Sequence, residues 1–208
     1  MAMTISLSDA GKRFNREWIF RHFNYTFEQA QAYALTGANG SGKSTLLQVL
    51  SGSMHFNEGS CVWSDEGSNP IPAEQVFRQV SICAPYLELV EEMTLLEFLV
   101  FHQTFKSYLP GITPSFIIEQ LDLQKASAKQ IRNFSSGMKQ RVKLAQCIFS
   151  DTALMLLDEP CTNLDVDGIS LYHRLIDQYR GDRLVIVSSN DEVEYSFCKH
   201  KINLFDYK

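Results

Sequence analysis

The sequence contains no long run of apolar residues. Its longest apolar segments are 95–101, which Glu97 interrupts, and the short segment 153–157, whereas a helix needs about 20 apolar residues to cross a bilayer. The N-terminal stretch MAMTISLSDAGKRF also lacks the basic start and apolar centre of a secretory signal peptide. We therefore expect a chain without a membrane span or a signal peptide.

Cysteines are few, odd in number and far apart. The five positions contain no C-x-x-C pair, whereas disulfide-rich domains and most zinc sites depend on paired spacings. We expect reduced thiols in a reducing compartment, buried as small hydrophobic side chains, at Cys61, Cys83, Cys147, Cys161 and Cys198.

An excess of positive charge is also absent. The chain has 19 Lys and Arg against 24 Asp and Glu, a net charge of -5, and nucleic-acid binders usually carry a basic surface. We expect no nucleic-acid partner. With 45% hydrophobic and 21% charged residues, the composition is that of a globular protein, and 208 residues are enough for one or two domains with a substantial core.

Segments of strand length recur along the chain, and segments with helical spacing separate many of them. Strands joined in this way form a parallel α/β sheet. The stretch 67–72 is turn-rich. The expected strands are Thr4–Leu7, Trp18–Phe27, Ala32–Thr36, Ser60–Trp63, Gln79–Ala84, 153–158, 183–189 and 201–205, and helices are expected from about residues 43, 136, 169 and 192.

Between residues 93 and 124 the pattern becomes helical without strands, which predicts a helical insert. Thr94 is the expected N-cap of its first helix, with Glu97 completing a capping box. We expect one apolar face on this helix, formed by Leu95, Leu96, Leu99 and Val100.

Residues 37–44, GANGSGKS, match the phosphate-loop pattern G-x-x-x-x-G-K-[ST] at every fixed position, between an expected strand and an expected helix. The glycines let backbone N–H groups turn inward around phosphates. Lys43 supplies a positive charge, and Ser44 offers its hydroxyl to Mg²⁺. The alternative is a flexible glycine-serine turn, but such a turn does not need a match at every fixed position of the pattern. We expect a nucleoside triphosphate with Mg²⁺ to be bound by Asn39, Gly40, Ser41, Gly42, Lys43, Ser44 and Thr45.

Asp158 and Glu159 follow the apolar strand segment 153–157. A strand delivers its terminal acid to the sheet edge where the phosphate loop also lies, so Asp158 is the expected Mg²⁺ partner. Glu159 can accept a proton from an attacking water. Alone, the pair would equally suit a solvated strand end. Beside a phosphate loop it favours a hydrolase over a P-loop kinase, which needs no second acid here.

A third segment, FSSGMKQR at 134–141, is a small-residue turn leading into a basic helix, and such helix starts bind anions. With the phosphate loop and LLDEPCTNLD at 156–165, it resembles the nucleotide-binding domain of ATP-binding cassette (ABC) proteins over nearly the whole chain. The family's signature is leucine-serine-glycine-glycine-glutamine. Here Ser135 and Gly137 are kept, while Ser136 and Met138 replace a glycine and the glutamine.

The resemblance implies an α/β fold, a P-loop NTPase parallel-sheet core with an N-terminal antiparallel β subdomain and an α-helical insert. It implies a single nucleotide-binding domain over 1–208, with the core and β subdomain in 1–86 and 136–208, and the insert in 87–135 carrying the signature turn at its end.

The resemblance also implies how two chains cooperate. Two nucleotide-binding subunits stack head to tail, and Ser135 and Gly137 of one close over the ATP in the phosphate loop of the other. Phe14 stands where the family places an aromatic ring that stacks on adenine, although Trp18 is a rival and a core role for Phe14 is the alternative. The loop 163–165 corresponds to the one that links the two sites.

Two positions depart from the family pattern. Tyr86 stands where the family has a glutamine that touches Mg²⁺ and water, with Glu88 nearby. Ser189, next to Asn190, stands where the family has a histidine that contacts the γ-phosphate, and neither residue can carry the charge available to histidine. We expect Glu159 and Ser189 to support hydrolysis that is slower than usual for the family or more dependent on a partner.

The function that follows is an ATP-hydrolysing subunit that powers a membrane ABC transporter. We expect it in the cytoplasm, peripheral on the inner face of the cell membrane, bound to an integral membrane permease and to a second copy of itself. Because Tyr86 replaces the residue that normally reports to a permease, a soluble ABC-type ATPase, for example in cofactor or iron–sulfur assembly, is the alternative.

Overall fold

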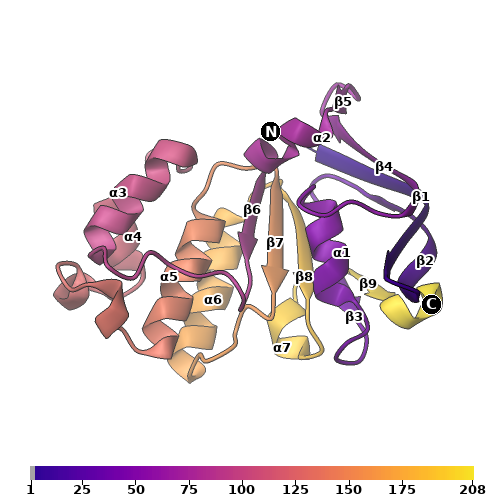
Figure 1. The fold of residues 1–208 in the computed structure, drawn as a ribbon. Helices are drawn as coiled ribbons and strands as arrows, with labels where there is room; N and C mark the ends of the chain where they lie inside the picture. Colours follow the sequence, from indigo (N-terminus) through magenta and orange to yellow (C-terminus); the bar gives the residue numbers. More distant parts are fainter. Residues whose placement is uncertain (1–2) are drawn as a thin grey trace. The chain divides into compact units, whose positions relative to one another are not determined.

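The computed structural model describes residues 3–208; residues 1 and 2, which the expected domain includes, lie outside this range. The chain forms two compact units (Figure 1). The first contains residues up to 80 with 152–158 and 182–208, and the second contains 81–151 with 159–181. The expected division at residues 87 and 135 stays a prediction.

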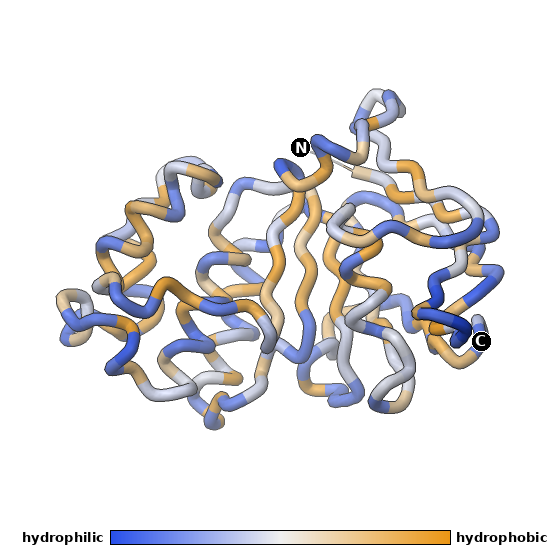
Figure 2. The backbone as a smooth tube through the Cα atoms, viewed as in Figure 1, coloured by the Kyte–Doolittle hydropathy of each residue, from blue (hydrophilic) through white to orange (hydrophobic). Residues whose placement is uncertain are grey.

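A parallel sheet forms the centre of the first unit. Four strands of this five-stranded sheet lie wholly in the first unit, in the order β7 (Leu154–Asp158), β8 (Leu184–Ser188), β3 (Ala32–Thr36) and β9 (His200–Asn203), and each neighbouring pair of these four is parallel. The residues of β7 and β8 are all buried, as is usual for parallel strands that are covered on both faces. In Figure 2, β7 and β8 are mostly orange, the colour of apolar residues. The expected α/β fold is confirmed.

An antiparallel sheet is the second sheet of this unit. Its order is β2 (Glu17–Phe27), β1 (Met3–Phe14), β4 (Glu58–Asp65) and β5 (Pro70–Ile71). The first three of these strands were expected. Each is longer than the segment expected from the sequence, because its backbone pairing continues beyond that segment. β5 lies inside the turn-rich stretch 67–72, where no strand was expected.

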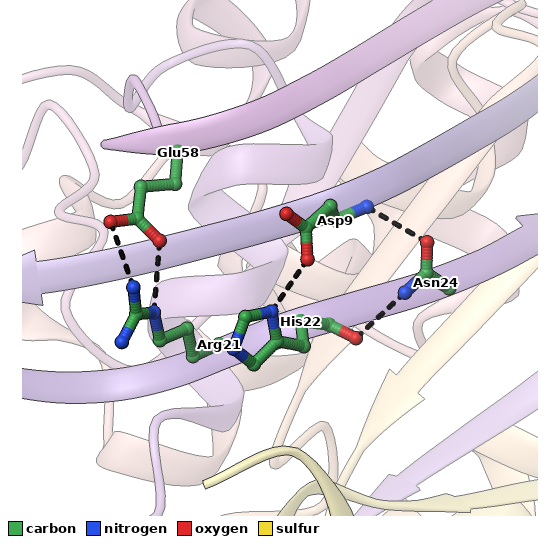
Figure 3. Close-up of polar contacts among 5 residues, drawn as sticks. All are labelled: Asp9, Arg21, His22, Asn24 and Glu58. Atoms are coloured by element: carbon green, nitrogen blue, oxygen red, sulfur yellow. Dashed lines mark hydrogen bonds and ion pairs between the residues drawn. The ribbon is translucent and has the colours of Figure 1, made fainter.

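The pairing of β1 with β2 is interrupted by bulges near Asp9. Asp9 and His22 both have positive φ, 49° and 54°, and Figure 3 shows how side chains hold them. The Asp9 carboxylate lies 2.6 Å from His22 Nδ1, and Asn24 Oδ1 accepts a hydrogen bond of 2.8 Å from the Asp9 N–H. The Arg21 guanidinium donates two hydrogen bonds, of 2.9 and 3.2 Å, to the Glu58 carboxylate.

The second unit is mainly helical. Its first long helix, α3 (Leu95–Phe105), begins with the expected capping box between Thr94 and Glu97. Of the four residues expected on its apolar face, Leu95 and Leu99 are buried. The expectation is wrong for Leu96 and Val100, which are 43% and 51% exposed. Residues 96 and 100 lie about 100° around the helix from the buried face, which is formed by Leu95, Phe98, Leu99 and His102.

The remaining elements have these bounds. Helices are α1 (Lys43–Leu50), α2 (Ala73–Val76), α4 (Pro114–Gln120), α5 (Ser136–Ile148), α6 (Val166–Tyr179) and α7 (Glu192–Tyr195), strand β6 is Val80–Cys83, and short 3-10 turns occupy Phe77–Gln79, Gln124–Ala126, Ile131–Asn133 and Leu204–Tyr207.

Two further expectations concern the whole chain. Among residues 3–208, no helix has the length and apolar character needed to cross a membrane. All cysteines are free thiols, but only three are buried, since Cys61 and Cys161 are partly exposed. The expectation of five buried thiols is therefore wrong at these two positions.

Candidate nucleotide site

The phosphate loop connects β3 to α1 in the first unit. Gly37, Gly40 and Gly42 have φ values of 142°, 77° and 102°, a region that side chains disfavour. At Gly42 a Cβ would also lie 2.1 Å from Cγ2 of Ile19. Gly42 is the N-cap of α1 and, within the described chain, no side chain caps this end. The first N–H groups of α1 are thus available to an anion.

Two buried polar groups belong to this loop. The Lys43 ammonium, on a residue only 6% exposed, donates to the carbonyl oxygen of Gly37 over 2.7 Å. Ser41 is 2% exposed, and its Oγ has no hydrogen-bond partner among the residues that the structure describes. Buried polar groups are normally paired. A buried cation and an unpaired hydroxyl in a backbone loop therefore fit a phosphate group.

Asp158 lies at the same edge of the parallel sheet. Asp158 of β7 and Leu35 of β3 are both in register with Ser188 of β8, which runs between them. Neighbouring strands lie about 4.8 Å apart, so the Asp158 carboxyl group ends the sheet beside the start of the phosphate loop. Ser44, in the first turn of α1, is half-buried. Carboxylate and hydroxyl oxygens are suitable Mg²⁺ ligands, and this pair fits the expected ion.

The end of β8 places Asn190, rather than Ser189, on the phosphate loop. Ser189 is buried, and its Oγ accepts a hydrogen bond of 2.9 Å from the Asp191 N–H. The exposed Asn190 accepts one of 3.2 Å from the Gly37 N–H and donates one of 3.4 Å to Asn39 Oδ1. The catalytic role of Ser189 stays a prediction. The contacts of Asn190 depend on the fold and were not evident from its position in the sequence.

Ser188 was not singled out from the sequence. It is fully buried, and its Oγ has no hydrogen-bond partner within residues 3–208. The sequence hinted at this buried hydroxyl only by placing a serine in an apolar strand segment.

Two aromatic residues at the β1–β2 hairpin were rivals for adenine stacking. Phe14 ends β1 and is 47% exposed, so its alternative role as a core residue is wrong. Lys12 Nζ lies 5.1 Å from the centroid of its ring. Trp18 is half-buried, and the guanidinium groups of Arg13 and Arg21 lie 5.4 and 4.5 Å from its ring. The more open ring is that of Phe14.

The signature turn lies in the second unit. Ser135 is the N-cap of α5, and its Oγ accepts a hydrogen bond of 3.2 Å from the Met138 N–H. Gly137 approaches the 163–165 loop so closely that a Cβ would lie 3.1 Å from Asn163 O. A cavity of about 410 Å³ opens at this place, lined by Ser135, Ser136, Gly137, Met138, Arg141, Asn163 and Asp165.

Charges around this cavity are partly paired. Asp165 caps α6 by accepting from the Gly168 N–H over 2.8 Å, and it lies 3.4 Å from the Arg141 guanidinium. The Gly168 hydrogen bond and the nearby Arg141 charge lower the pKa of Asp165. The cavity thus combines a helix N-terminus with an arginine, an arrangement that suits an anion.

Glu159 and Tyr86 follow β7 and β6. Glu159 has a φ of 45°, in the left-handed region that non-glycine residues seldom occupy and that is frequent at functional sites. Its side chain is exposed, and its carbonyl accepts from the Thr162 N–H over 3.1 Å. Tyr86 is 47% exposed, and Glu88 is exposed as well.

Comparisons with known proteins agree with this geometry. The family model described as "ABC transporter" matches residues 20–162. The chain is 30% identical to the ABC transporter ATP-binding protein YybJ of Bacillus subtilis (strain 168), over 93% of this chain and 89% of that protein. It is 32% identical to the cytochrome c biogenesis ATP-binding export protein CcmA of Xylella fastidiosa (strain 9a5c), over 74% of this chain and 68% of that one.

The fold is likewise similar to that of a dimeric ATP-binding cassette solved in a post-hydrolysis state with ADP and Pi. The TM-score is 0.80 at 18% identity, and the match covers 96% of this chain and 93% of that one. Because the family model spans more than half of the chain and a relative of 30% identity is matched over most of its length, the chain belongs to the ABC transporter family, as an ATP-binding nucleotide-binding domain.

Proposed function

We propose that this chain hydrolyses ATP to power a membrane transporter, and that two copies work head to tail with ATP at their interface. The observation that carries this proposal is the cavity at the signature turn, which joins a capped helix start, Arg141 and the 163–165 loop. The chain also has its own phosphate loop. One copy therefore carries two different halves of an anion site, and two copies supply two complete sites.

In the proposed complex, the phosphates lie against the first N–H groups of α1, with Lys43 and Ser41 as side-chain partners and Asn39, Gly40 and Thr45 completing the loop. Phe14 stacks on the adenine ring. Ser44 and Asp158 hold Mg²⁺, which neutralises phosphate charge when bound. The second copy contributes the Ser135 hydroxyl and the Gly137 N–H, which complete the surroundings of the terminal phosphate and exclude water.

Glu159 is the proposed general base. Its carboxylate orients a water molecule and accepts its proton as the oxygen attacks the terminal phosphorus, while the bond from that phosphorus to the bridging oxygen breaks and ADP leaves. Members of this family hydrolyse ATP, but Tyr86 and the buried Ser189 replace two groups that usually assist. A phenol reaches further and more rigidly than a carboxamide, and a serine hydroxyl cannot become a cation. We therefore infer that hydrolysis is slow.

The proposed membrane partner docks on α3. Four apolar side chains on this helix are exposed by 40–72%, and clustered exposed apolar residues usually mark an interaction surface. We assign this surface, the α3 patch, to a cytoplasmic segment of an integral membrane permease. The relatives support that partner, since CcmA is named an export protein and YybJ a transporter protein. The α3 patch consists of Leu96, Val100, Phe101 and Phe105.

The Glu159→Gln variant tests the mechanism and the dimer together. It removes the base but keeps a side chain of the same size, so MgATP should bind normally while hydrolysis falls by about a hundredfold or more. Since ATP is then not consumed, a dimer should accumulate, which light scattering at saturating MgATP would detect. Lys43→Ala is the control, because loss of the phosphate contact should abolish both binding and dimerisation. A strictly monomeric Glu159→Gln protein, or one that retains full turnover, would contradict the proposal.

A further inference from the structure

A buried glutamine in the second unit makes a contact that is not part of the candidate nucleotide site. Gln140 lies on α5, one turn beyond the signature turn, and is only 4% exposed. Its Nε2 donates a hydrogen bond of 2.7 Å to the carbonyl oxygen of Pro160 and lies 3.7 Å from Cys83 Sγ. The shorter contact reaches the residue directly after Glu159.

The turn that Gln140 contacts is conformationally unusual. Glu159 has a φ of 45°, and a residue with a side chain keeps such a conformation only where its surroundings enforce it. Within the turn, the carbonyls of Glu159 and Cys161 accept from the N–H groups of Thr162 and Leu164. The Pro160 carbonyl between them instead accepts from Gln140, across the gap to α5.

Gln140 is also the buried member of a series of contacts between α5 and the segment 159–165. On one side Gly137 lies close to Asn163, where a Cβ would come within 3.1 Å of its carbonyl oxygen. On the other side, Arg141 and Asp165 form a 3.4 Å ion pair, with Asp165 exposed. Exposed ion pairs contribute little to stability, whereas a buried hydrogen bond to a backbone carbonyl is costly to break. Gln140 is therefore a buried polar restraint from α5 on this segment.

We propose that Gln140 is a positioning residue for ATP hydrolysis, holding the Glu159–Pro160 turn so that the Glu159 carboxylate points in one direction. This inference rests on the proposed role of Glu159 as general base. Gln140 is not assigned a contact with nucleotide or water; it acts through the Pro160 carbonyl. A small displacement of a catalytic group can cost about a hundredfold in rate, so loss of this restraint should slow the chemical step while leaving nucleotide affinity unchanged.

The test is the Gln140→Met variant, which keeps the length and helix propensity of the side chain but removes its donor. We expect kcat to fall by about tenfold or more, with the Kd for MgATP within about twofold of wild type. Gln146→Met is the matched control. Gln146 lies on the same helix, but its amide is 3.0 Å from His102, so this variant should keep the wild-type kcat. Thermal unfolding of both variants shows whether each is folded at the assay temperature.

A second variant keeps the inference testable if Gln140→Met is unstable. In Gln140→Glu, an ionised carboxylate can only accept hydrogen bonds, but its protonated form can donate to Pro160. Burial raises the pKa of such a carboxyl group, so kcat of this variant relative to Gln140→Met should increase as the pH falls from 8 towards 6. A ratio that does not change with pH would contradict a role for donation to Pro160.

Two outcomes separate this inference from the function on which it rests. If Glu159→Gln is inactive but folded Gln140→Met turns over at the wild-type rate, the positioning role is wrong and the proposed function stands. If Glu159→Gln is fully active, the proposed function fails first. Equal losses of kcat in Gln140→Met and Gln146→Met would show a general effect of α5 stability and would also overturn the inference.

Discussion

Asn190 shows at the scale of one residue how the phosphate loop depends on side chains outside its motif. Its carboxamide joins the Gly37 N–H to the Asn39 side chain, at 3.2 and 3.4 Å. A typical hydrogen bond contributes about 0.5–1.5 kcal/mol, so two such contacts favour the loop conformation that binds phosphate. Asn190→Ala should therefore raise the Kd for MgATP by about five- to tenfold, as measured by titration calorimetry.

The control for this variant is another asparagine in the same unit. Asn24 also accepts from a backbone N–H, that of Asp9, at 2.8 Å (Figure 3), but it belongs to the antiparallel sheet. Asn24→Ala should leave the Kd for MgATP unchanged. Equal effects of the two substitutions would mean that Asn190 acts through stability rather than through the loop.

At the scale of secondary-structure elements, a buried histidine joins α3 to the end of α5. His102 Nδ1 lies 3.0 Å from the Gln146 amide nitrogen, which can only donate, and Nε2 lies 2.9 Å from Ser150 Oγ. These contacts select neutral imidazole with its proton on Nε2. Burial, assisted by the positive charge of Lys106, lowers the pKa of His102 from 6.5 to about 4.

This lowered pKa predicts a loss of stability in weak acid. Below pH 6.5 the unfolded chain binds a proton at this histidine, whereas the folded chain does so only near pH 4, so the free energy of unfolding decreases between these values. The loss attributable to His102 is up to about 3 kcal/mol. Urea unfolding from pH 7.5 to 4 should show a steeper decline for wild type than for His102→Gln, which has no imidazole to protonate. Parallel curves would assign the acid sensitivity to other groups.

At the scale of the whole molecule, the α3 patch predicts a membrane partner. Val100→Asp and Phe105→Asp place charges on exposed positions of α3, so they should leave folding and MgATP binding intact but abolish the association with an integral membrane protein. Phe77→Asp is the control, because Phe77 is equally an exposed aromatic residue, 60% accessible, on another element. The readout is co-purification from detergent-solubilised membranes, with the partner identified by mass spectrometry as a multi-span protein.

Two results would contradict the docking assignment. A membrane complex that tolerates both aspartates would place the permease on another surface. A purely soluble partner would instead favour the alternative of an ABC-type ATPase that works without a permease.

Much of the fold could be predicted because its determinants are local. The capping box of α3 requires only Thr94 and Glu97, three residues apart, and it is present. The segment Ala32–Thr36 has the same bounds in the structure as in the prediction, since a short apolar segment before a phosphate loop is a strand in this context. The signature turn was likewise recognisable from consecutive residues.

Other features depend on contacts between distant segments. Leu96 and Val100 have the same apolar character as the buried Leu95 and Leu99, so composition could not tell which side of α3 faces the core. Ser189 and Asn190 are both polar, and only the path of the chain after β8 decides which side chain reaches Gly37. The contact of Gln140 with Pro160 joins residues that no local pattern connects.

The sequence by itself determined the family of this protein, because the phosphate loop, the paired acids and the signature turn each consist of consecutive residues. Only the tertiary structure decided which polar side chains support those motifs and which apolar residues remain at the surface. The physical reason is that burial and hydrogen-bond pairing depend on which segments pack together, and distance along the chain does not specify this packing.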